Sequence, residues 1–166
     1  MNVQLFIPCF VDQLYPETAM NMVKVLEKLG CKLSYNPNQT CCGQPAFNAG
    51  YWEETTAVAK KFIQDFEGLD YIVAPSGSCT GFVRNFYERL FENTNNLSAS
   101  EKVGQRLYEF TEFLVDVLKV TDVGAKLEGR ATYHDACGAL RECGIKSPTK
   151  AVRTGKRIGI SGNERV

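Results

Sequence analysis

The chain has 166 residues, with 19 basic and 19 acidic side chains, 44% hydrophobic residues, seven cysteines and one histidine. A domain of this size folds without disulfide staples, and its 11% aromatic content excludes a disordered chain. No apolar run reaches the roughly 20 residues of a membrane span, and no basic segment precedes the apolar N-terminus. We therefore expect a cytoplasmic protein, in which cysteines are metal-binding, catalytic or inert rather than paired in disulfides.

The zero net charge conceals an asymmetry along the chain. Up to residue 144 there are 13 basic and 18 acidic residues, whereas residues 145–166 contain six basic residues and one acidic residue. The basic residues of this tail are scattered among Gly, Ser and Thr, and no segment combines clustered basic and aromatic side chains. We therefore expect no nucleic-acid partner, and an irregular basic tail.

Strand-like and helix-like segments alternate from the N-terminus onward. Short apolar runs predict strands at residues 3–8, 31–35, 70–75 and 131–134. Apolar residues at helical spacing predict helices at residues 16–29, 52–66, 79–91 and 107–120. The polar stretch at residues 93–100 predicts a loop. This alternation predicts an α/β fold of Rossmann-like type, with a mostly parallel sheet, helices on both faces and right-handed crossovers.

Most of the cysteines follow predicted strands, either just beyond the strand end or in the next turn. These are Cys9, Cys41, Cys42, Cys79 and Cys137. Ligands bind at the carboxyl ends of the strands in open α/β sheets. We therefore expect a site at this edge, where the thiols converge if the strands are neighbours.

The spacing of the first four of these cysteines favours a metal centre. Cys9 is followed by 31 residues, then Cys41-Cys42-Gly43, then 35 residues and Cys79. Four thiolates suffice for an iron–sulfur cluster or a tetrahedral zinc ion. Adjacent cysteines reach one centre only if the backbone turns sharply, as Gly43 permits, or if the centre has several irons. A single zinc ion is served more simply by a Cys-x-x-Cys pair, which this chain lacks, so the pattern favours a cluster.

These motifs resemble the cysteine-rich CCG domain of heterodisulfide reductase B subunits, the glycerol-3-phosphate dehydrogenase C subunit and the A subunit of bacterial L-lactate utilization complexes. The segments LFIPCFVDQLYPE, NQTCCGQPAFNAGY, VAPSGSC and YHDAC are most similar to the last of these, over about residues 1–144. Ser76 falls where a complete motif has the first cysteine of a final Cys-x-x-Cys pair. The resemblance implies an iron–sulfur cluster, expected to be 4Fe-4S, with these ligand positions: Cys9, Cys41, Cys42 and Cys79.

The resemblance also implies partners and a second repeat. An A subunit of this kind works with two partner subunits, one iron–sulfur and one small, in oxidising L-lactate to pyruvate. Cys137 resembles the first cysteine of a second motif, but only 29 residues follow it, too few to reach another cysteine pair at the same spacing. We therefore expect residues 1–128 to form one CCG unit, 129–144 to open an incomplete repeat, and 145–166 to be the tail of a truncated or frame-shifted member.

The leading interpretation is an iron–sulfur oxidoreductase subunit that transfers electrons in the oxidation of L-lactate to pyruvate. The same residues leave alternatives open. One is a structural or binding module that is cluster-free or holds zinc, inactive because the second motif is missing. Another is a thiol-based reductase that uses Cys41 and Cys42. A Cys–His scheme would depend on His134, the single histidine, and no catalytic residue is assigned. Cys31 and Cys143 are expected to be core residues.

Overall fold

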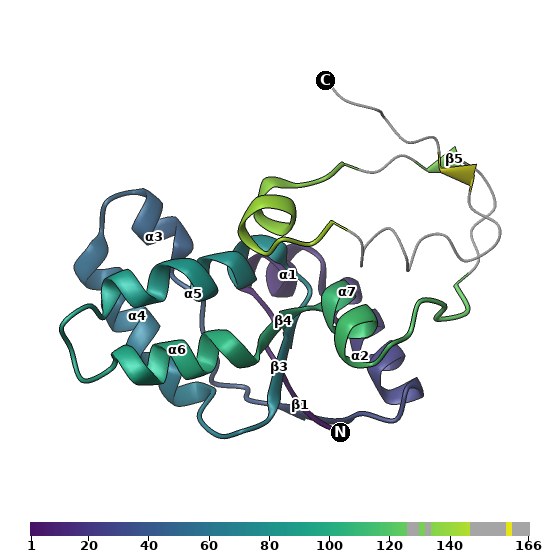
Figure 1. Ribbon diagram of the computed structural model, residues 1–166, viewed down its shortest axis with the longest axis horizontal. Helices are drawn as coiled ribbons and strands as arrows, with labels where there is room; N and C mark the ends of the chain where they lie inside the picture. The colour runs from purple at the N-terminus through teal and green to yellow at the C-terminus, as the bar shows by residue number, and fades with distance from the viewer. Residues whose placement is uncertain (126–129, 132–133, 147–158, 161–166) are drawn as a thin grey trace.

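The structure is a computed structural model that describes residues 1–125, 130–131, 134–146 and 159–160. Its central sheet has four parallel strands in the order β2-β1-β3-β4 (Figure 1). The strands are β1 (Asn2–Leu5), β2 (Lys32–Tyr35), β3 (Tyr71–Ala74) and β4 (Leu107–Glu109). A separate parallel pair joins β5 (Arg130–Ala131) to β6 (Gly159–Ile160). The parallel sheet confirms the predicted α/β class.

Helices cover both faces of the central sheet. One face carries α4 (Trp52–Asp65), α5 (Gly77–Leu90) and α6 (Leu97–Arg106). The other face carries α1 (Cys9–Leu14), α2 (Pro16–Lys28), and α7 (Phe110–Glu112) with the π-helical turn η1 (Phe113–Val117). Two further elements are α3 (Gln44–Asn48), which precedes α4, and the π-helical turn η2 (Gly138–Glu142), which packs on α5. None of the helices in the described part of the chain has the length and apolar character of a membrane span.

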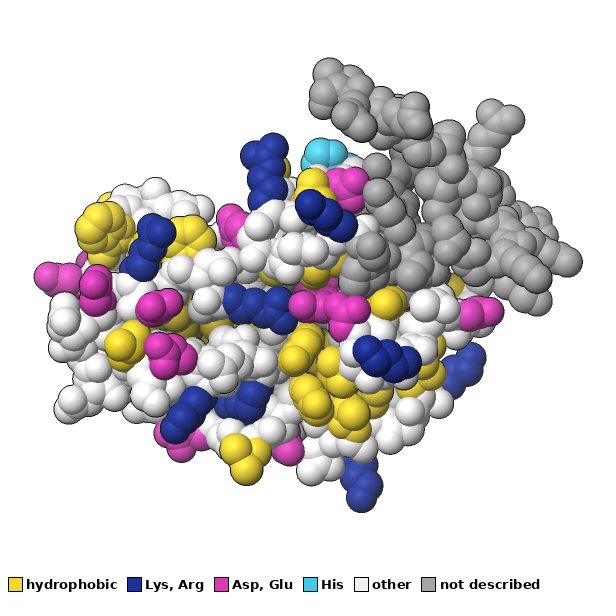
Figure 2. All heavy atoms as spheres, in the orientation of Figure 1, with side chains coloured by type: hydrophobic (Ala, Val, Ile, Leu, Met, Phe, Trp, Pro, Cys, Tyr) yellow, Lys and Arg dark blue, Asp and Glu magenta, His cyan; other side chains and the backbone are white. Residues whose placement is uncertain are grey.

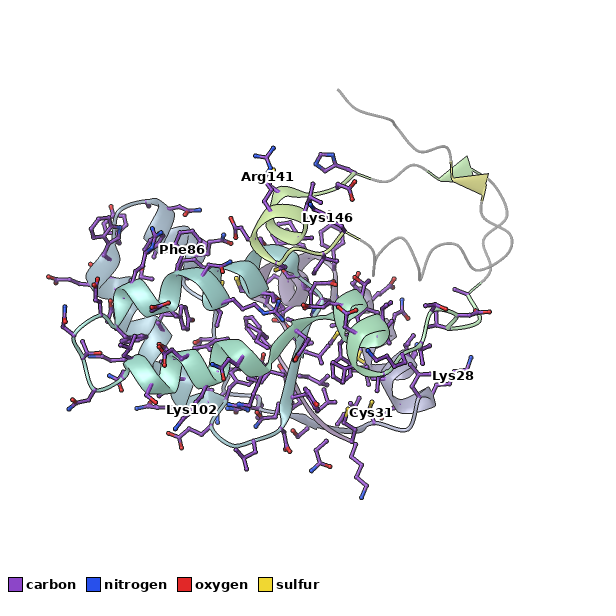
Figure 3. The ribbon with its side chains drawn as sticks, viewed as in Figure 1. Lys28, Cys31, Phe86, Lys102, Arg141 and Lys146 are labelled. Carbon is purple, nitrogen blue, oxygen red and sulfur yellow. The ribbon has the colours of Figure 1, made fainter. Side chains whose placement is uncertain are left out.

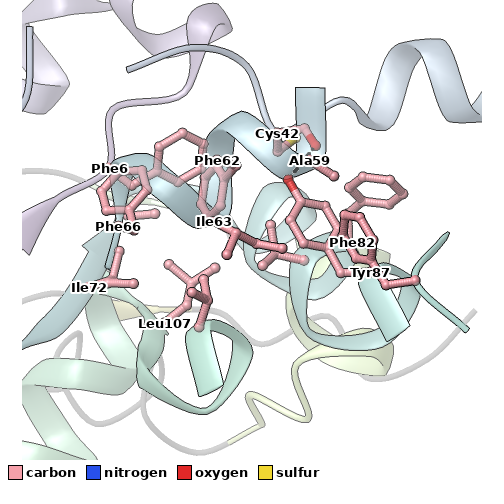
Figure 4. Packing of buried hydrophobic residues seen from close by; sticks show 14 residues of the cluster. Phe6, Cys42, Ala59, Phe62, Ile63, Phe66, Ile72, Phe82, Tyr87 and Leu107 are labelled. Carbon is pink, nitrogen blue, oxygen red and sulfur yellow. Dashed lines mark hydrogen bonds between the residues drawn. The ribbon is translucent and has the colours of Figure 1, made fainter. Parts of the chain in front are cut away.

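Alternation along the strands produces two cores. On β3, Val73 faces the core under α1 and α2, whereas Ile72 and Ala74 face the core under α4 and α5, because successive strand side chains point to opposite faces. In the second core Phe6 packs edge-on against Phe62, with 4.8 Å between ring centroids (Figure 4). The central strand β3 is therefore covered on both sides, whereas the edge strand β2 is mostly exposed.

Residues 107–120 differ from the predicted helix. Residues 107–109 form β4, in which Leu107 pairs with Ile72 of β3, and helical structure begins only at Phe110. The side chain of Glu109 accepts hydrogen bonds from the backbone N–H groups of Thr111 and Glu112, so it caps the helix that follows. The prediction of one uninterrupted helix was wrong because residues 107–109 become a strand only by pairing with β3, and this tertiary contact is not visible in the local apolar pattern.

Three other boundaries also differ from the sequence predictions. The predicted loop at residues 93–100 contains the start of α6, which begins at Leu97. The strand predicted at residues 131–134 is described only as Arg130–Ala131, in the separate pair, and residues 132–133 lie outside the described residues. Within the predicted tail, Gly159–Ile160 is a strand, and residues 147–158 and 161–166 lie outside the described residues.

Candidate metal centre

The thiols of four cysteines meet at the carboxyl edge of the sheet. Cys9 is the first residue of α1, Cys41 and Cys42 lie between β2 and α3, and Cys79 is in the first turn of α5. The Sγ atoms of Cys9 and Cys41 are 3.4 Å apart, and the Cys42 thiol contacts both Cys41 and Cys79. The four candidate ligands named from the sequence are therefore brought together in one contiguous chain of sulfur contacts.

The burial of these thiols is graded. Cys9 is exposed, Cys41 and Cys79 are half-buried, and Cys42 has only 1% of its surface exposed. All seven cysteines of the chain are free thiols. A centre held here has one exposed edge, at Cys9, and one edge embedded in the aromatic core.

Gly43 makes the turn that lets adjacent cysteines point to the same place. Its φ of 91° is in the left-handed region that favours glycine. A Cβ there would also lie 3.3 Å from Thr55 Cγ2. The Gly43 N–H donates to the Cys41 Sγ at 3.4 Å, while Cys42 turns into the core. The sharp turn expected from the CCG triplet is present.

The contacts between Cys41 and Cys42 set their protonation. The pKa of Cys41 is lowered to about 5, chiefly because the Cys42 thiol donates a hydrogen bond to it and also because the Gly43 N–H does so. The pKa of Cys42 is raised, first by the hydrogen bonds it donates to Cys41 and Cys79 and then by burial. Cys42 therefore keeps its proton, and Cys41 is a thiolate near neutral pH.

Cys79 is the second site of thiolate character. Its pKa is lowered to about 7, first by the Cys42 thiol and then by the hydroxyls of Ser76 and Ser78, against the opposing effect of burial. Ser76 also accepts a hydrogen bond from the Cys79 N–H at 3.4 Å, and so caps α5. The pKa of Cys9 is raised by burial and by its neighbour Cys41. Because the thiolate is the form that binds metals, Cys41 and Cys79 are prepared as ligands.

The arrangement differs from that of a single-ion site. Within the described ranges, no group of three or more His, Cys, Asp or Glu side chains is placed to hold one metal ion. The thiols instead form a row, in the order Cys9, Cys41, Cys42 and Cys79. An all-thiol donor set suits an iron–sulfur cluster, whose several irons are each approached by a different cysteine. By its chemistry the donor set therefore fits a cluster.

The other candidates named from the sequence lie outside this row. Cys137 is exposed just before η2, and His134 is exposed at the surface, where the one histidine is visible in Figure 2. Cys31 is buried at the opposite end of the sheet (Figure 3), which confirms its prediction as a core residue. Cys143 is only half-buried, and its thiol donates to the Gly77 carbonyl at 3.3 Å, so its prediction as a core residue was partly wrong.

Residues 134–146 contact the site from above α5. A Cβ on Gly77 would lie 2.9 Å from Ala139 Cβ, and one on Gly138 would lie 2.8 Å from Ser78 Cα. These backbones approach so closely only because both positions are glycines. Arg141 and Lys146 are exposed and point away from α5 (Figure 3). The sequence alone did not indicate this packing role for Gly138.

Two other site residues were missed from the sequence. The side chain of Gln39 bonds to the end of β1, and the hydroxyl of Tyr87 bonds to the Cys42 carbonyl. Gln39 precedes the cysteine pair by two residues and Tyr87 follows Cys79 by two helical turns. Their proximity to the cysteines was the only available signal.

The fold and the row of thiols define the chain as a cysteine-rich α/β domain. The sequence model of the family described as "CCG: Cysteine-rich domain" matches residues 3–84, a range that includes all four thiols of the row. No solved structure gives a significant match.

Curated relatives identify the family more closely. Lactate utilization protein A of Geobacillus sp. (strain WCH70) is 44% identical over 162 residues, which cover 96% of this chain and 68% of that protein. The protein of the same name from Geobacillus kaustophilus (strain HTA426) is 46% identical over 147 residues, 88% of this chain and 61% of that protein. Lactate utilization protein A of Bacillus pumilus (strain SAFR-032) is 44% identical over 146 residues, which cover 88% of this chain and 61% of that protein. The chain belongs to the lactate utilization protein A family, and it spans 61 to 68% of the length of these relatives.

Proposed function

We propose that this chain is an iron–sulfur subunit that transfers electrons in the oxidation of L-lactate to pyruvate. The observation that carries the proposal is the row of four contacting thiols at the carboxyl edge of a parallel sheet. The family supports the link to lactate, since its members are named for lactate utilization. The proposed ligands are Cys9, Cys41, Cys42 and Cys79, with a 4Fe-4S cluster expected.

Each part of the protein has a defined task in this proposal. A bound cluster supplies one-electron transfer. Cys41 and Cys79 offer thiolates, and Cys42 releases its proton when it becomes a ligand, so cluster binding releases protons. The Ser76 and Ser78 hydroxyls bond to Cys79, and hydrogen bonds to a ligand sulfur stabilise the more reduced, more negative state. The protein therefore sets the potential of the centre through these hydroxyls and through burial of Cys42.

The proposal extends to the partners and the location. Electrons would pass to other subunits of a lactate-oxidising complex, through the exposed edge at Cys9. A cytoplasmic location agrees with the free state of every cysteine. Cys137, which is exposed and outside the row, is assigned to a second motif rather than to this centre. In this proposal L-lactate is oxidised elsewhere in the complex or at a subunit junction, and no lactate-binding residue is assigned to this chain.

Anaerobic metal analysis tests the proposed function. The protein is purified without oxygen, reconstituted with iron and sulfide, and assayed for both, with visible absorption as a second measurement. We expect a brown protein with about four irons per chain, as a 4Fe-4S cluster requires. The Cys79→Ser variant should lose most of this iron, and the matched Cys137→Ser variant should retain it. A colourless wild-type protein that holds stoichiometric zinc, or no metal after reconstitution, would contradict the proposal.

A further inference from the structure

Two side chains tie together the three segments that carry the thiols. Gln39 bridges the segment before Cys41 and the segment before Cys9. Tyr87 bridges Cys42 and α5, the helix that carries Cys79. Neither residue is a candidate ligand, and each of these three hydrogen bonds joins a side chain to a backbone group of another segment.

Gln39 extends the pairing of β1 and β2 beyond the point where the strands end. The last paired residues of these strands are Leu5 and Tyr35. The Gln39 Oε1 then accepts a hydrogen bond from the Ile7 N–H at 2.7 Å, and its Nε2 donates to the Leu5 carbonyl at 3.1 Å. The side-chain amide thus occupies the place of the next backbone amide in the ladder. The same Nε2 donates to the Asn36 carbonyl at 3.1 Å, which fixes the amide to its own loop as well.

Tyr87 ties the cysteine pair to α5 from inside the core. The side chain is fully buried, and its hydroxyl donates to the Cys42 carbonyl at 2.8 Å (Figure 4). Its ring packs edge-on against Phe62 and Phe82, with 5.6 Å between centroids in each pair. The aromatic neighbours leave the hydroxyl little freedom to move. A buried carbonyl that loses its donor is costly, because no water replaces the bond.

We propose that Gln39 and Tyr87 are positioning residues for the cluster: Gln39 sets the separation of Cys9 from Cys41, and Tyr87 holds Cys42 against Cys79. The inference rests on the proposed function, because it concerns the same four thiols. A cluster bound by three independent loops is retained only as long as the loops stay in place. Releasing one tie therefore opens a path for loss of iron without removing a ligand.

The test uses two variants that remove only the hydrogen bonds. Tyr87→Phe keeps the ring and removes the hydroxyl, and Gln39→Leu keeps most of the volume and removes the amide. Tyr71→Phe is the matched control, since Tyr71 packs in the other core against Tyr108 and Phe113. Gln64→Leu, on the exposed side of α4, is the second control.

The primary measurement is the rate at which reconstituted protein releases iron to a ferrous chelator. We expect each positioning variant to release iron about tenfold faster, which corresponds to about 1.4 kcal/mol. Both controls should match the wild-type rate. Gln39→Glu keeps the acceptor for the Ile7 N–H but turns a carboxylate oxygen toward the carbonyls of Leu5 and Asn36, so it should release iron at least as fast as Gln39→Leu.

A second measurement needs no cluster. The metal-free protein is titrated with phenylarsine oxide, which bridges two neighbouring thiols, and we expect weaker binding in Gln39→Leu because Cys9 and Cys41 are then less firmly held. Arg84→Ala separates positioning from general destabilisation, since Arg84 bonds to Leu107 and Glu112 rather than to the cysteine loops. The inference would be overturned if the rate of iron release rose in proportion to the loss of stability in every variant, Arg84→Ala included. It would also be overturned if Gln39→Leu and Tyr87→Phe both released iron at the wild-type rate.

The outcomes also separate this inference from the proposed function. Wild-type protein that takes up no iron and sulfide contradicts the proposed function, and unchanged arsenical binding in Gln39→Leu then overturns its positioning role as well. Wild-type protein that retains a cluster, with variants that retain it equally well, overturns only the positioning roles of Gln39 and Tyr87.

Discussion

Replacing Gly81 with alanine measures how closely residues 134–146 pack on α5. Gly81 is a buried residue in the interior of that helix. A Cβ at this position would lie 2.6 Å from Glu142 Oε2 and 2.7 Å from Glu142 Cβ. Gly104 in α6 is the matched control, because a Cβ there would meet nothing nearer than Arg84 Cα at 3.6 Å, an ordinary contact.

The two substitutions share one energy term and differ in another. Each replaces glycine by alanine inside a helix, which stabilises by about 1 kcal/mol. At Gly81 the new methyl group stands about 1 Å closer to Glu142 Cβ than carbon atoms prefer, so α5 and η2 must separate. Overpacking of this kind costs about 1–3 kcal/mol. We expect Gly104→Ala to raise the free energy of unfolding by about 1 kcal/mol. The free energy of unfolding of Gly81→Ala should be about 1–3 kcal/mol lower than that of Gly104→Ala.

Urea unfolding followed by circular dichroism measures this difference. Alkylation of Cys143 provides a local measurement, because this half-buried thiol bonds to the Gly77 carbonyl and lies 3.4 Å from the position of a Cβ on Gly81. We expect faster alkylation of Cys143 in Gly81→Ala and an unchanged rate in Gly104→Ala. Equal stabilisation by both substitutions, with Cys143 equally protected, would refute the packing of residues 134–146 on α5.

Three further predictions concern the thiols and the charged network beside them. In metal-free protein, the rate of Cys41 alkylation by iodoacetamide should change little from pH 8 to pH 6 and should fall only as the pH drops through about 5. Over the same interval from pH 8 to pH 6, a thiol of ordinary pKa reacts about a hundredfold more slowly. A hundredfold decrease at Cys41 would contradict the lowered pKa. Ser76→Ala should make the reduction potential of the loaded cluster more negative in a redox titration, because the hydroxyl bonds to the Cys79 sulfur. It should also lower the free energy of unfolding by about 1 kcal/mol, because the hydroxyl caps α5. An unchanged potential would show that the hydroxyl does not affect the potential of the cluster. Arg84→Ala should destabilise the fold by about 3 kcal/mol in urea unfolding, because it removes the cationic partner of the half-buried Glu112 and the guanidinium donor to the Leu107 carbonyl. A loss below about 1 kcal/mol would mark the pair as an ordinary surface bridge.

The Arg84 network also occupies the surface beside the proposed centre. Arg84 makes two hydrogen bonds to Glu112, at 3.0 and 2.9 Å, and its guanidinium stacks over the Tyr108 ring at 5.2 Å. On the face shown in Figure 2, basic and acidic side chains are interspersed over α5 and α6. The carboxyl end of β4 is thus filled by an ion pair, whereas the ends of β1 and β3 lead to thiols.

Two of the elements that were not predicted, β4 and α6, show the limits of periodicity. Leu107 stands three residues before Phe110 and seven before Leu114, so it fits the helical pattern although it belongs to β4. Its strand conformation depends on pairing with Ile72, a contact that local sequence does not encode. In α6 the buried positions include Ser100 and Gly104, small residues that give no apolar signal.

The sequence by itself determined that the chain is an α/β domain and that Cys9, Cys41, Cys42 and Cys79 lie beyond strand ends. Local spacing is sufficient for both conclusions, because helices and strands bury residues at different periods. It also determined the turn at Gly43, which depends on the conformational freedom of one residue.

Only the tertiary structure decided which thiols meet and what holds them. The strand order β2-β1-β3-β4 places the loops of Cys9, Cys41 and Cys79 side by side, since β1 lies between β2 and β3. The bonds from Gln39 and Tyr87 join residues that are 32 to 45 positions apart. Contacts between distant segments depend on how the strands pair and on how the helices pack, and neither arrangement is contained in the local pattern of any one segment.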